Sequence, residues 1–96
     1  MNQTSTKSEY IVFVEDDLEL AGLIVDRLRL EGFRISHFPN GESACEAILS
    51  EPPDLVVLDI MLPGMDGFGV CRKIRPEYDG PILILTALDD DLDQIL

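Results

Sequence analysis

Acidic residues stand directly after two apolar segments of this 96-residue chain. Glu15 and Asp16 follow the segment 10–14, and Asp59 follows the segment 55–58. Carboxylates that converge repel one another, by about 4 kcal/mol at ~4 Å and an effective dielectric of about 20, and a bound cation removes that repulsion. An oxygen-only set without His or Cys selects a hard ion such as Mg²⁺. An aspartate that keeps a free oxygen can also act as a nucleophile and form an acyl phosphate.

A hydroxyl, that of Thr86, follows a third apolar segment. Each of these polar side chains also has an ordinary structural interpretation, because strand-end residues often cap the next helix. This is our interpretation of Asp17, and Thr86 can play the same part. Asp59 is different, because it precedes an apolar, turn-like stretch and not a helix. No structural role is evident for an acid at that position.

Strands and helices that alternate along the chain must position these residues. Short β-branched and aromatic runs predict strands at 10–14, 33–38, 55–58 and 82–85. Helical spacing of apolar residues predicts helices over 18–30, 42–50 and 68–75, and another beginning near Asp89. This alternation predicts an α/β fold with a doubly wound parallel sheet of the flavodoxin-like order 2-1-3-4-5. Strands one, three and four are then neighbours, so Glu15, Asp16, Asp59 and Thr86 meet at one edge of the sheet.

Single positions within these elements carry further expectations. Asp17 is expected to cap the first helix and Gly32 to end it. Cys45 and Cys71 lie among apolar helix positions, so we expect both to be buried, reduced thiols. His37 has no acidic neighbours in the sequence and is expected at the surface or on an edge strand. The first helix is predicted from the spacing of Leu18, Leu20, Leu23, Ile24, Leu28 and Leu30.

Acidic residues outnumber basic ones by 19 to 7, which gives a net charge of −12. This charge argues against contact of this segment with nucleic acid or with an anionic membrane, because both need clustered Lys and Arg. No apolar run approaches the ~18 residues of a membrane span. Residues 1–9 are polar and lack the apolar core of a signal peptide. We therefore expect a flexible leader over 1–9, one domain over 10–96, and a cytoplasmic protein.

Three strings, at 12–17, 58–67 and 84–87, occur in order and resemble the signature segments of CheY-like receiver domains of two-component response regulators. The resemblance runs from about Tyr10 to Leu96. It is closest to the OmpR class, transcription regulators with a winged-helix DNA-binding domain after the receiver. It implies phosphorelay signalling, a non-enzymatic phosphoacceptor switch, a sensor histidine kinase as partner, and a homodimer of the full-length protein on activation. DNA would be contacted only through a domain absent from this chain.

The resemblance also implies roles for single residues. Asp59 would accept the phosphoryl group from the kinase. Asp16 would ligate Mg²⁺ directly and Glu15 would do so through water. Met61 would offer its backbone carbonyl to the metal. Thr86 would move its hydroxyl to a phosphoryl oxygen and so report the modification.

One departure from the family pattern stands out. Receivers need a lysine at the end of a fifth strand, whereas Lys7 lies in the leader and Lys73 in the third helix. We therefore expect the receiver to be incomplete, with the fifth strand and fifth helix missing. Strand 82–85 would then form an exposed apolar edge, which invites pairing with another chain.

Three functions remain as alternatives. The first is a switch phosphorylated on Asp59. The second is a phosphatase with an aspartate nucleophile, but such enzymes carry a second acid two residues later, where this chain has Met61. The third is a receiver-like dimerisation unit that never takes a phosphoryl group, which the missing lysine leaves open.

Overall fold

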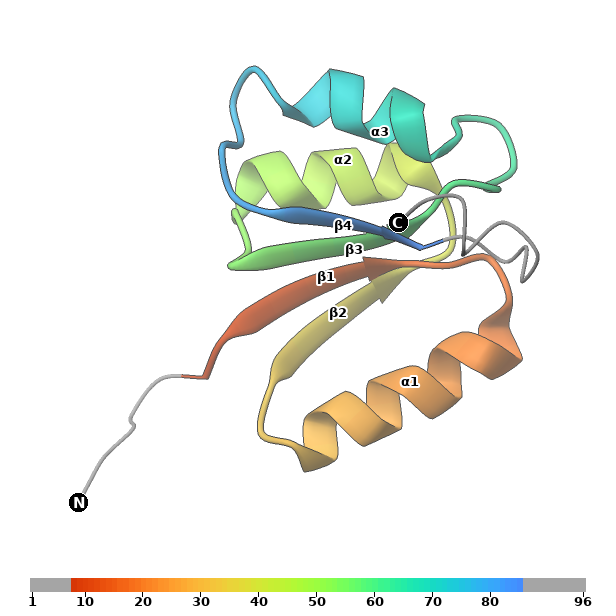
Figure 1. Cartoon of the computed structure of the whole chain (residues 1–96), viewed down its shortest axis with the longest axis vertical. Helices are drawn as coiled ribbons and strands as arrows, with labels where there is room; N and C mark the ends of the chain where they lie inside the picture. The colour runs from red at the N-terminus through yellow and green to blue at the C-terminus, as the bar shows by residue number, and fades with distance from the viewer. Residues whose placement is uncertain (1–7, 86–96) are drawn as a thin grey trace, which may run out of the picture.

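Strands and helices alternate in the computed structural model, which describes residues 8–85 (Figure 1). The strands are β1 (Tyr10–Val14), β2 (Arg34–Phe38), β3 (Leu55–Asp59) and β4 (Ile82–Leu85). The helices are α1 (Leu18–Leu30), α2 (Gly41–Ser50) and α3 (Gly67–Ile74). Every element predicted within this range is confirmed, with ends displaced by at most one residue. Thr86 and the helix expected near Asp89 lie outside the described residues.

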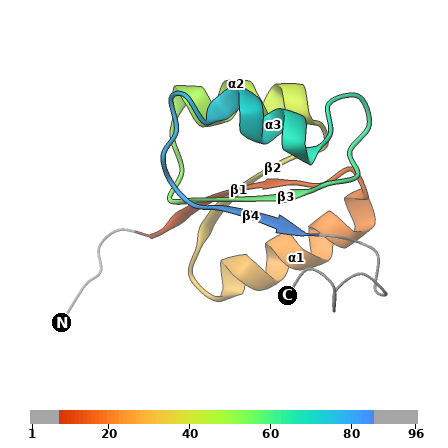
Figure 2. The ribbon, with the colours of Figure 1, turned by 45° about the horizontal axis from the view of Figure 1, so that its top comes forward.

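The four strands form one parallel sheet in the order β2-β1-β3-β4. The predicted order is thus confirmed for strands one to four, and no fifth strand occurs between residues 8 and 85. The two helices α2 and α3 lie on one face of the sheet and α1 lies on the other (Figure 2). Helices on both faces of a parallel sheet explain why β1, β3 and β4 are nearly continuous apolar runs, whereas the edge strand β2 alternates in part.

Each face of the sheet has its own hydrophobic core. Successive residues of β1 point to opposite faces, so Val12 and Val14 join one core while Ile11 and Phe13 join the other. The core under α2 and α3 is the larger. Its buried members are Tyr10, Val12, Val14, Ala44, Cys45, Ile48, Val56, Leu58, Leu62, Val70, Ile74 and Tyr78. The core under α1 contains Ile11, Phe13, Ala21, Val25 and Ile35.

The helix ends follow the predicted local chemistry. Asp17 caps α1 by accepting a hydrogen bond from the backbone N–H of Leu20 at 3.1 Å, as predicted. Asn40 and Asp66 cap α2 and α3 in the same way, through Ser43 and Gly69. Gly32 has a φ of 98° directly after α1, a left-handed conformation that favours glycine and ends the helix.

The expectation that both cysteines are buried is confirmed for one of them and wrong for the other. Cys45 is buried, but Cys71 is only half-buried, because it lies on the flank of α3. The leucine spacing correctly predicts α1, yet Leu18 and Leu23 are exposed while Ala21 and Val25 are buried. The small side chain of Ala21 lets the helix approach the sheet closely.

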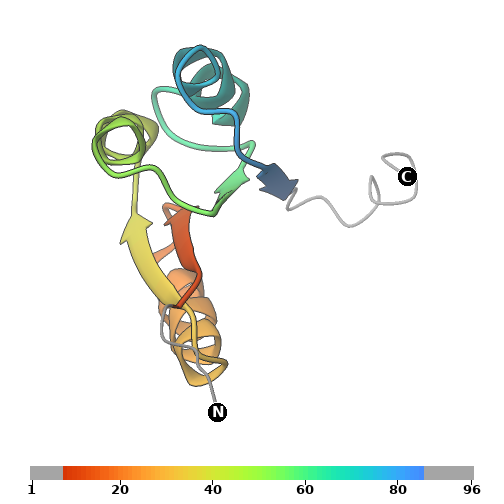
Figure 3. The same ribbon diagram turned by 90° about the vertical axis from the view of Figure 1, so that its left-hand side faces the viewer.

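The α1 side of the sheet is covered only in part. Figure 3 shows α1 beside β1 and β2, and no helix of the described chain beside β3 and β4 on this side. A hollow of about 360 Å³ lies there, lined mainly by apolar side chains of β1, β3, β4 and the end of α1, with Glu9 and Asp54 also on its wall. Among the described strands β4 is an edge, as predicted, and Leu83 is half exposed. No helix within residues 8–85 is long and apolar enough to cross a membrane.

Candidate metal centre

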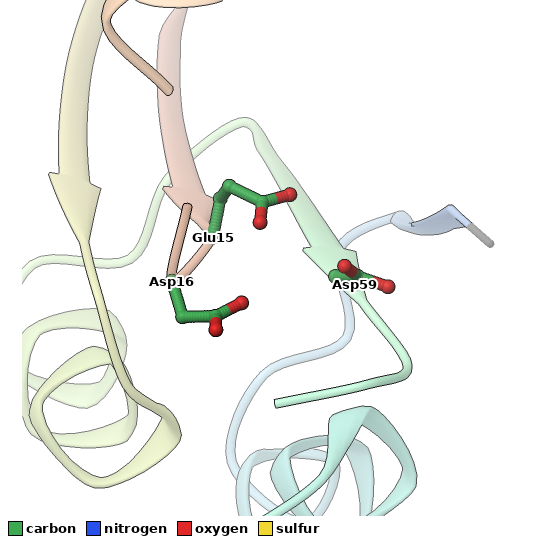
Figure 4. Close-up of side chains that lie close together, drawn as sticks. All are labelled: Glu15, Asp16 and Asp59. Atoms are coloured by element: carbon green, nitrogen blue, oxygen red, sulfur yellow. The ribbon is translucent and has the colours of Figure 1, made fainter. Parts of the chain in front are cut away.

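The carboxyl ends of β1 and β3 lie side by side and bring three acids together. Val14 pairs with Leu58 in the sheet, so the residues that follow them, Glu15 and Asp59, are neighbours. Asp16 is the next residue after Glu15 and turns toward the same space (Figure 4). One carboxylate oxygen from each of the three residues lies within 4.8 Å of the others. The predicted meeting of Glu15, Asp16 and Asp59 is therefore confirmed.

Backbone hydrogen bonds fix two of the three side chains. The carboxylate of Glu15 accepts the N–H of Asp17 at 3.0 Å. The Oδ1 atom of Asp59 accepts the N–H of Met61 at 3.2 Å. Both carboxylates are nearly buried, with 6% and 8% of the residue exposed for Glu15 and Asp59, whereas Asp16 is exposed. The cluster thus consists of two buried carboxylates, those of Glu15 and Asp59, and one solvent-exposed carboxylate, that of Asp16.

Burial is the main reason that the pKa of Glu15 lies above its ordinary value of 4.5. The negative charges of Asp59 and Asp16 raise this pKa further, while the hydrogen bond from Asp17 opposes the rise. Burial and like charge both disfavour an ionised carboxylate. A divalent cation among the three acids would remove both penalties, and carboxylate oxygens are the ligands that Mg²⁺ prefers. The donor set therefore fits a hard cation.

A close backbone approach places Asp59 against the start of α3. A Cβ atom built on Gly67 would lie 2.6 Å from the carbonyl oxygen of Asp59 and 2.9 Å from the Cα of Ile60. The backbone N–H of Gly67 also donates to the carbonyl of Ile60 at 3.0 Å. Only glycine allows this contact, so Gly67 fixes the path of the loop after Asp59. The Asp66-Gly67 pair predicts a turn, but nothing in the sequence signals this approach.

Four further residues carried a prediction from the sequence: Met61, Thr86, Asp17 and His37. The backbone of Met61 lies beside Asp59 and its side chain is 62% exposed, an arrangement compatible with a role for the backbone alone. Thr86 lies outside the described residues, so its predicted position is untested. The side chain of Asp17 caps α1 and lies outside the cluster, to which only its backbone N–H is bonded. His37, expected on the surface or an edge strand, is half-buried on β2, and its ring contacts the carbonyl of Glu15.

The sequence is similar to those of known proteins in which the same kind of domain occurs. The family model described as "Response regulator receiver domain" matches residues 11–95. The transcriptional regulatory protein RstA of Escherichia coli is 51% identical over 86 residues, which cover 90% of this chain and 36% of RstA. The probable transcriptional regulator ycf27 of Cyanidium caldarium is 38% identical, over 98% of this chain and 38% of its own length. The chain thus spans little more than a third of these two relatives.

Solved structures agree as well. The BeF3-activated N-terminal receiver domain of Klebsiella pneumoniae RstA superimposes with a TM-score of 0.79 at 49% identity, over 90% of this chain and 74% of that one. The response regulator TrrA of Thermotoga maritima, in complex with Mg²⁺ and BeF, also gives 0.79, at 34% identity over 91% of this chain and 76% of that one. Fold, acid cluster and sequence lead to one conclusion: the chain belongs to the receiver-domain family of two-component response regulators.

Proposed function

We propose that this receiver is a Mg²⁺-dependent phosphoacceptor switch that takes a phosphoryl group on Asp59 from a sensor histidine kinase. The observation that carries the proposal is the grouping of Glu15, Asp16 and Asp59 within 4.8 Å at the end of two neighbouring strands. Glu15, Asp16, the carboxylate of Asp59 and the backbone carbonyl of Met61 would hold the ion. When bound, Mg²⁺ would neutralise charge on the transferring phosphoryl oxygens.

Asp59 is the best nucleophile of the three acids. The N–H of Met61 holds its Oδ1 atom, which fixes the carboxylate plane and leaves Oδ2 to attack phosphorus. The bond from phosphorus to the kinase histidine would break as the bond to Asp59 forms. The electron pair of the broken bond would return to the ring nitrogen, and the imidazole would leave neutral with its hydrogen on the other nitrogen. Two residues later, the thioether of Met61 cannot transfer a proton. This favours a switch that keeps its phosphoryl group over a phosphatase.

Relatives support the same interpretation. The Klebsiella receiver is described as BeF3-activated and the Thermotoga receiver as a complex with Mg²⁺ and BeF. Beryllium fluoride resembles a phosphoryl group in shape and charge, so both complexes are what a phosphoacceptor beside a Mg²⁺ site would form. The two sequence relatives are named as transcriptional regulators. We therefore propose a cytoplasmic, OmpR-class transcription regulator, in which a domain outside this chain contacts DNA.

Phosphorylation by acetyl phosphate tests the proposal. With Mg²⁺ present, mass spectrometry of the digested protein should find one phosphoryl adduct, on Asp59, and Asp59→Asn should abolish it. Asp16→Asn should weaken Mg²⁺ binding by about tenfold or more. Asp17→Asn is the matched control, because it removes a charge one residue away and keeps a good helix cap. An adduct on another residue, or equal losses in Asp16→Asn and Asp17→Asn, would reject the assignment.

The proposal extends to Thr86 as the switch hydroxyl. The carbonyl of Leu85 accepts the N–H of Ile60 at 3.2 Å, so β4 is tied to the residue directly after Asp59 at the point where Thr86 follows. A hydroxyl recruited to the phosphoryl group there would bias a two-state equilibrium in the residues after it. In the full-length regulator, Thr86→Ala should be phosphorylated normally but dimerise less, as measured by sedimentation. Equal dimerisation would exclude this role.

A further inference from the structure

The backbone carbonyl of Glu15 is bonded in an unusual way for a residue at the end of a sheet. The N–H of Glu15 continues the parallel ladder and donates to Phe38 at 3.0 Å. There β2 ends, before the N–H of Asn40, which is the next one that this register would offer to the Glu15 carbonyl. Among the described residues, the carbonyl of Glu15 meets a side chain instead, the Nε2 atom of His37 at 2.7 Å.

The His37 ring is held in place for this contact. His37 pairs with Phe13 across the two strands, and the two rings pack with centroids 5.9 Å apart. A carbonyl can only accept a hydrogen bond, so Nε2 must carry the hydrogen. Because packing already fixes the ring, little conformational entropy is lost in forming the bond. This half-buried histidine is therefore a built contact and not a loose surface side chain.

The bonded carbonyl lies in the peptide plane that joins Glu15 to Asp16, and peptide planes are rigid. We infer that His37 is a positioning residue for the cation site: by holding this carbonyl, its Nε2–H fixes the direction in which the Glu15–Asp16 pair enters the acid cluster. The carboxylate of Glu15 is held separately by the N–H of Asp17. Loss of the His37 bond would leave the ladder intact but let the peptide plane before Asp16 rotate.

A competing explanation is that His37 merely fastens β2 to β1. The two explanations differ in which substitution restores function. Glutamine places its amide nitrogen at nearly the position of Nε2, whereas the amide of asparagine is one carbon short. A fastening role through packing of the ring on Phe13 is lost in both amides, while a positioning role depends on a donor at the right distance.

The Mg²⁺ affinity of the purified protein, measured by isothermal titration calorimetry, distinguishes a positioning role of His37 from a fastening role. The inference rests on the proposed function, so wild type is measured first, and wild type that binds no Mg²⁺ would overturn both. We expect His37→Asn to weaken Mg²⁺ binding by about 3- to 10-fold, the worth of one hydrogen bond, and His37→Gln to bind within about twofold of wild type. Ser36→Ala controls for general effects on β2, because Ser36 contacts the Tyr10 hydroxyl and not Glu15. Asparagine and glutamine variants that bind equally would overturn the positioning role and leave the proposed function standing.

A second measurement needs no metal. The ¹⁵N shifts of the ring nitrogens show which one carries the hydrogen when the imidazole is neutral. We expect the Nε2–H tautomer of His37 in the native protein. A neutral ring with its hydrogen on Nδ1 cannot donate to Glu15 and would overturn the inference, whatever the Mg²⁺ affinities are.

Discussion

The two faces of the sheet are packed to different degrees. On the side of α2 and α3, Val56 and Leu58 of β3 are fully buried. On the side of α1, the alternate residues Leu55 and Val57 are only partly buried, and Leu83 of β4 borders the hollow. The same strand that ends in Asp59 therefore has one closed face and one partly open face within the described chain.

This difference shows which contacts determine the position of Asp59. The loop after Asp59 turns toward the closed face, where Gly67 packs against its backbone and Leu62 joins the larger core. Glu15 and Asp16 come from β1, which is covered on both sides by the described helices. The acid cluster is thus built on the well-packed part of the sheet, and the open part lies beyond it, toward β4.

Deleting side chains on each face should give the largest contrast. Ile48 of α2 is fully buried in the larger core, so Ile48→Ala should lower the free energy of unfolding by about 2–5 kcal/mol. Leu83 is half exposed at the hollow, and Leu83→Ala should cost only about 0.5 kcal/mol. Urea denaturation measures both. Equal losses would mean that the open face is covered in solution.

Two glycines offer a second contrast. Gly67→Ala would push a Cβ atom into the backbone of Asp59 and Ile60, so we expect a loss of about 1–3 kcal/mol and weaker Mg²⁺ binding. Gly22, in the middle of α1, faces open space, and a Cβ atom added there would meet no other atom within 4 Å. Gly22→Ala should therefore stabilise the protein, by about 0.5–1 kcal/mol. If Gly67→Ala is tolerated as well as Gly22→Ala, the loop after Asp59 is not held against α3.

The stability of the protein should depend on pH through Glu15, at the edge of the sheet where the acids meet. Because the pKa of Glu15 is raised above 4.5, the folded protein holds this proton more tightly than the unfolded chain. Ionising Glu15 therefore costs stability, and the cost develops as the pH rises from about 4.5 through the raised pKa. In EDTA, Glu15→Gln should be more stable than wild type at neutral pH and should lose this advantage below pH 4.5.

A neutral amide can still accept the N–H of Asp17, so this substitution changes charge and keeps the hydrogen bond. Glu46→Gln is the matched control, because it makes the same change of side chain on the exposed side of α2, away from the acid cluster. Thermal unfolding of wild type and both variants across the pH range measures these differences in stability. A constant difference between Glu15→Gln and wild type would mean that burial does not oppose ionisation of Glu15.

Strand order and the acid cluster were both predictable from the sequence, for a simple physical reason. Apolar runs mark buried strands, parallel strands end at the same edge, and the residues after β1 and β3 therefore meet. The contacts of His37 and Gly67 were not predictable, because they depend on distances across the fold. A histidine without acidic neighbours gives no sign of a carbonyl 22 residues away, and a glycine beside aspartate indicates only a turn.

The hydrogen bond from Ile60 to Leu85 has a consequence for local unfolding. It joins the amide next to Asp59 to the last described residue of β4, the strand on the partly open side. Amides in such edges exchange with solvent by local opening, without unfolding of the whole domain. The amide of Ile60 therefore exchanges when its hydrogen bond to Leu85 opens, while the amides of β1, which lies between β2 and β3, exchange far more slowly. Whatever binds over β4 and closes that side of the sheet will slow exchange beside Asp59 without touching it.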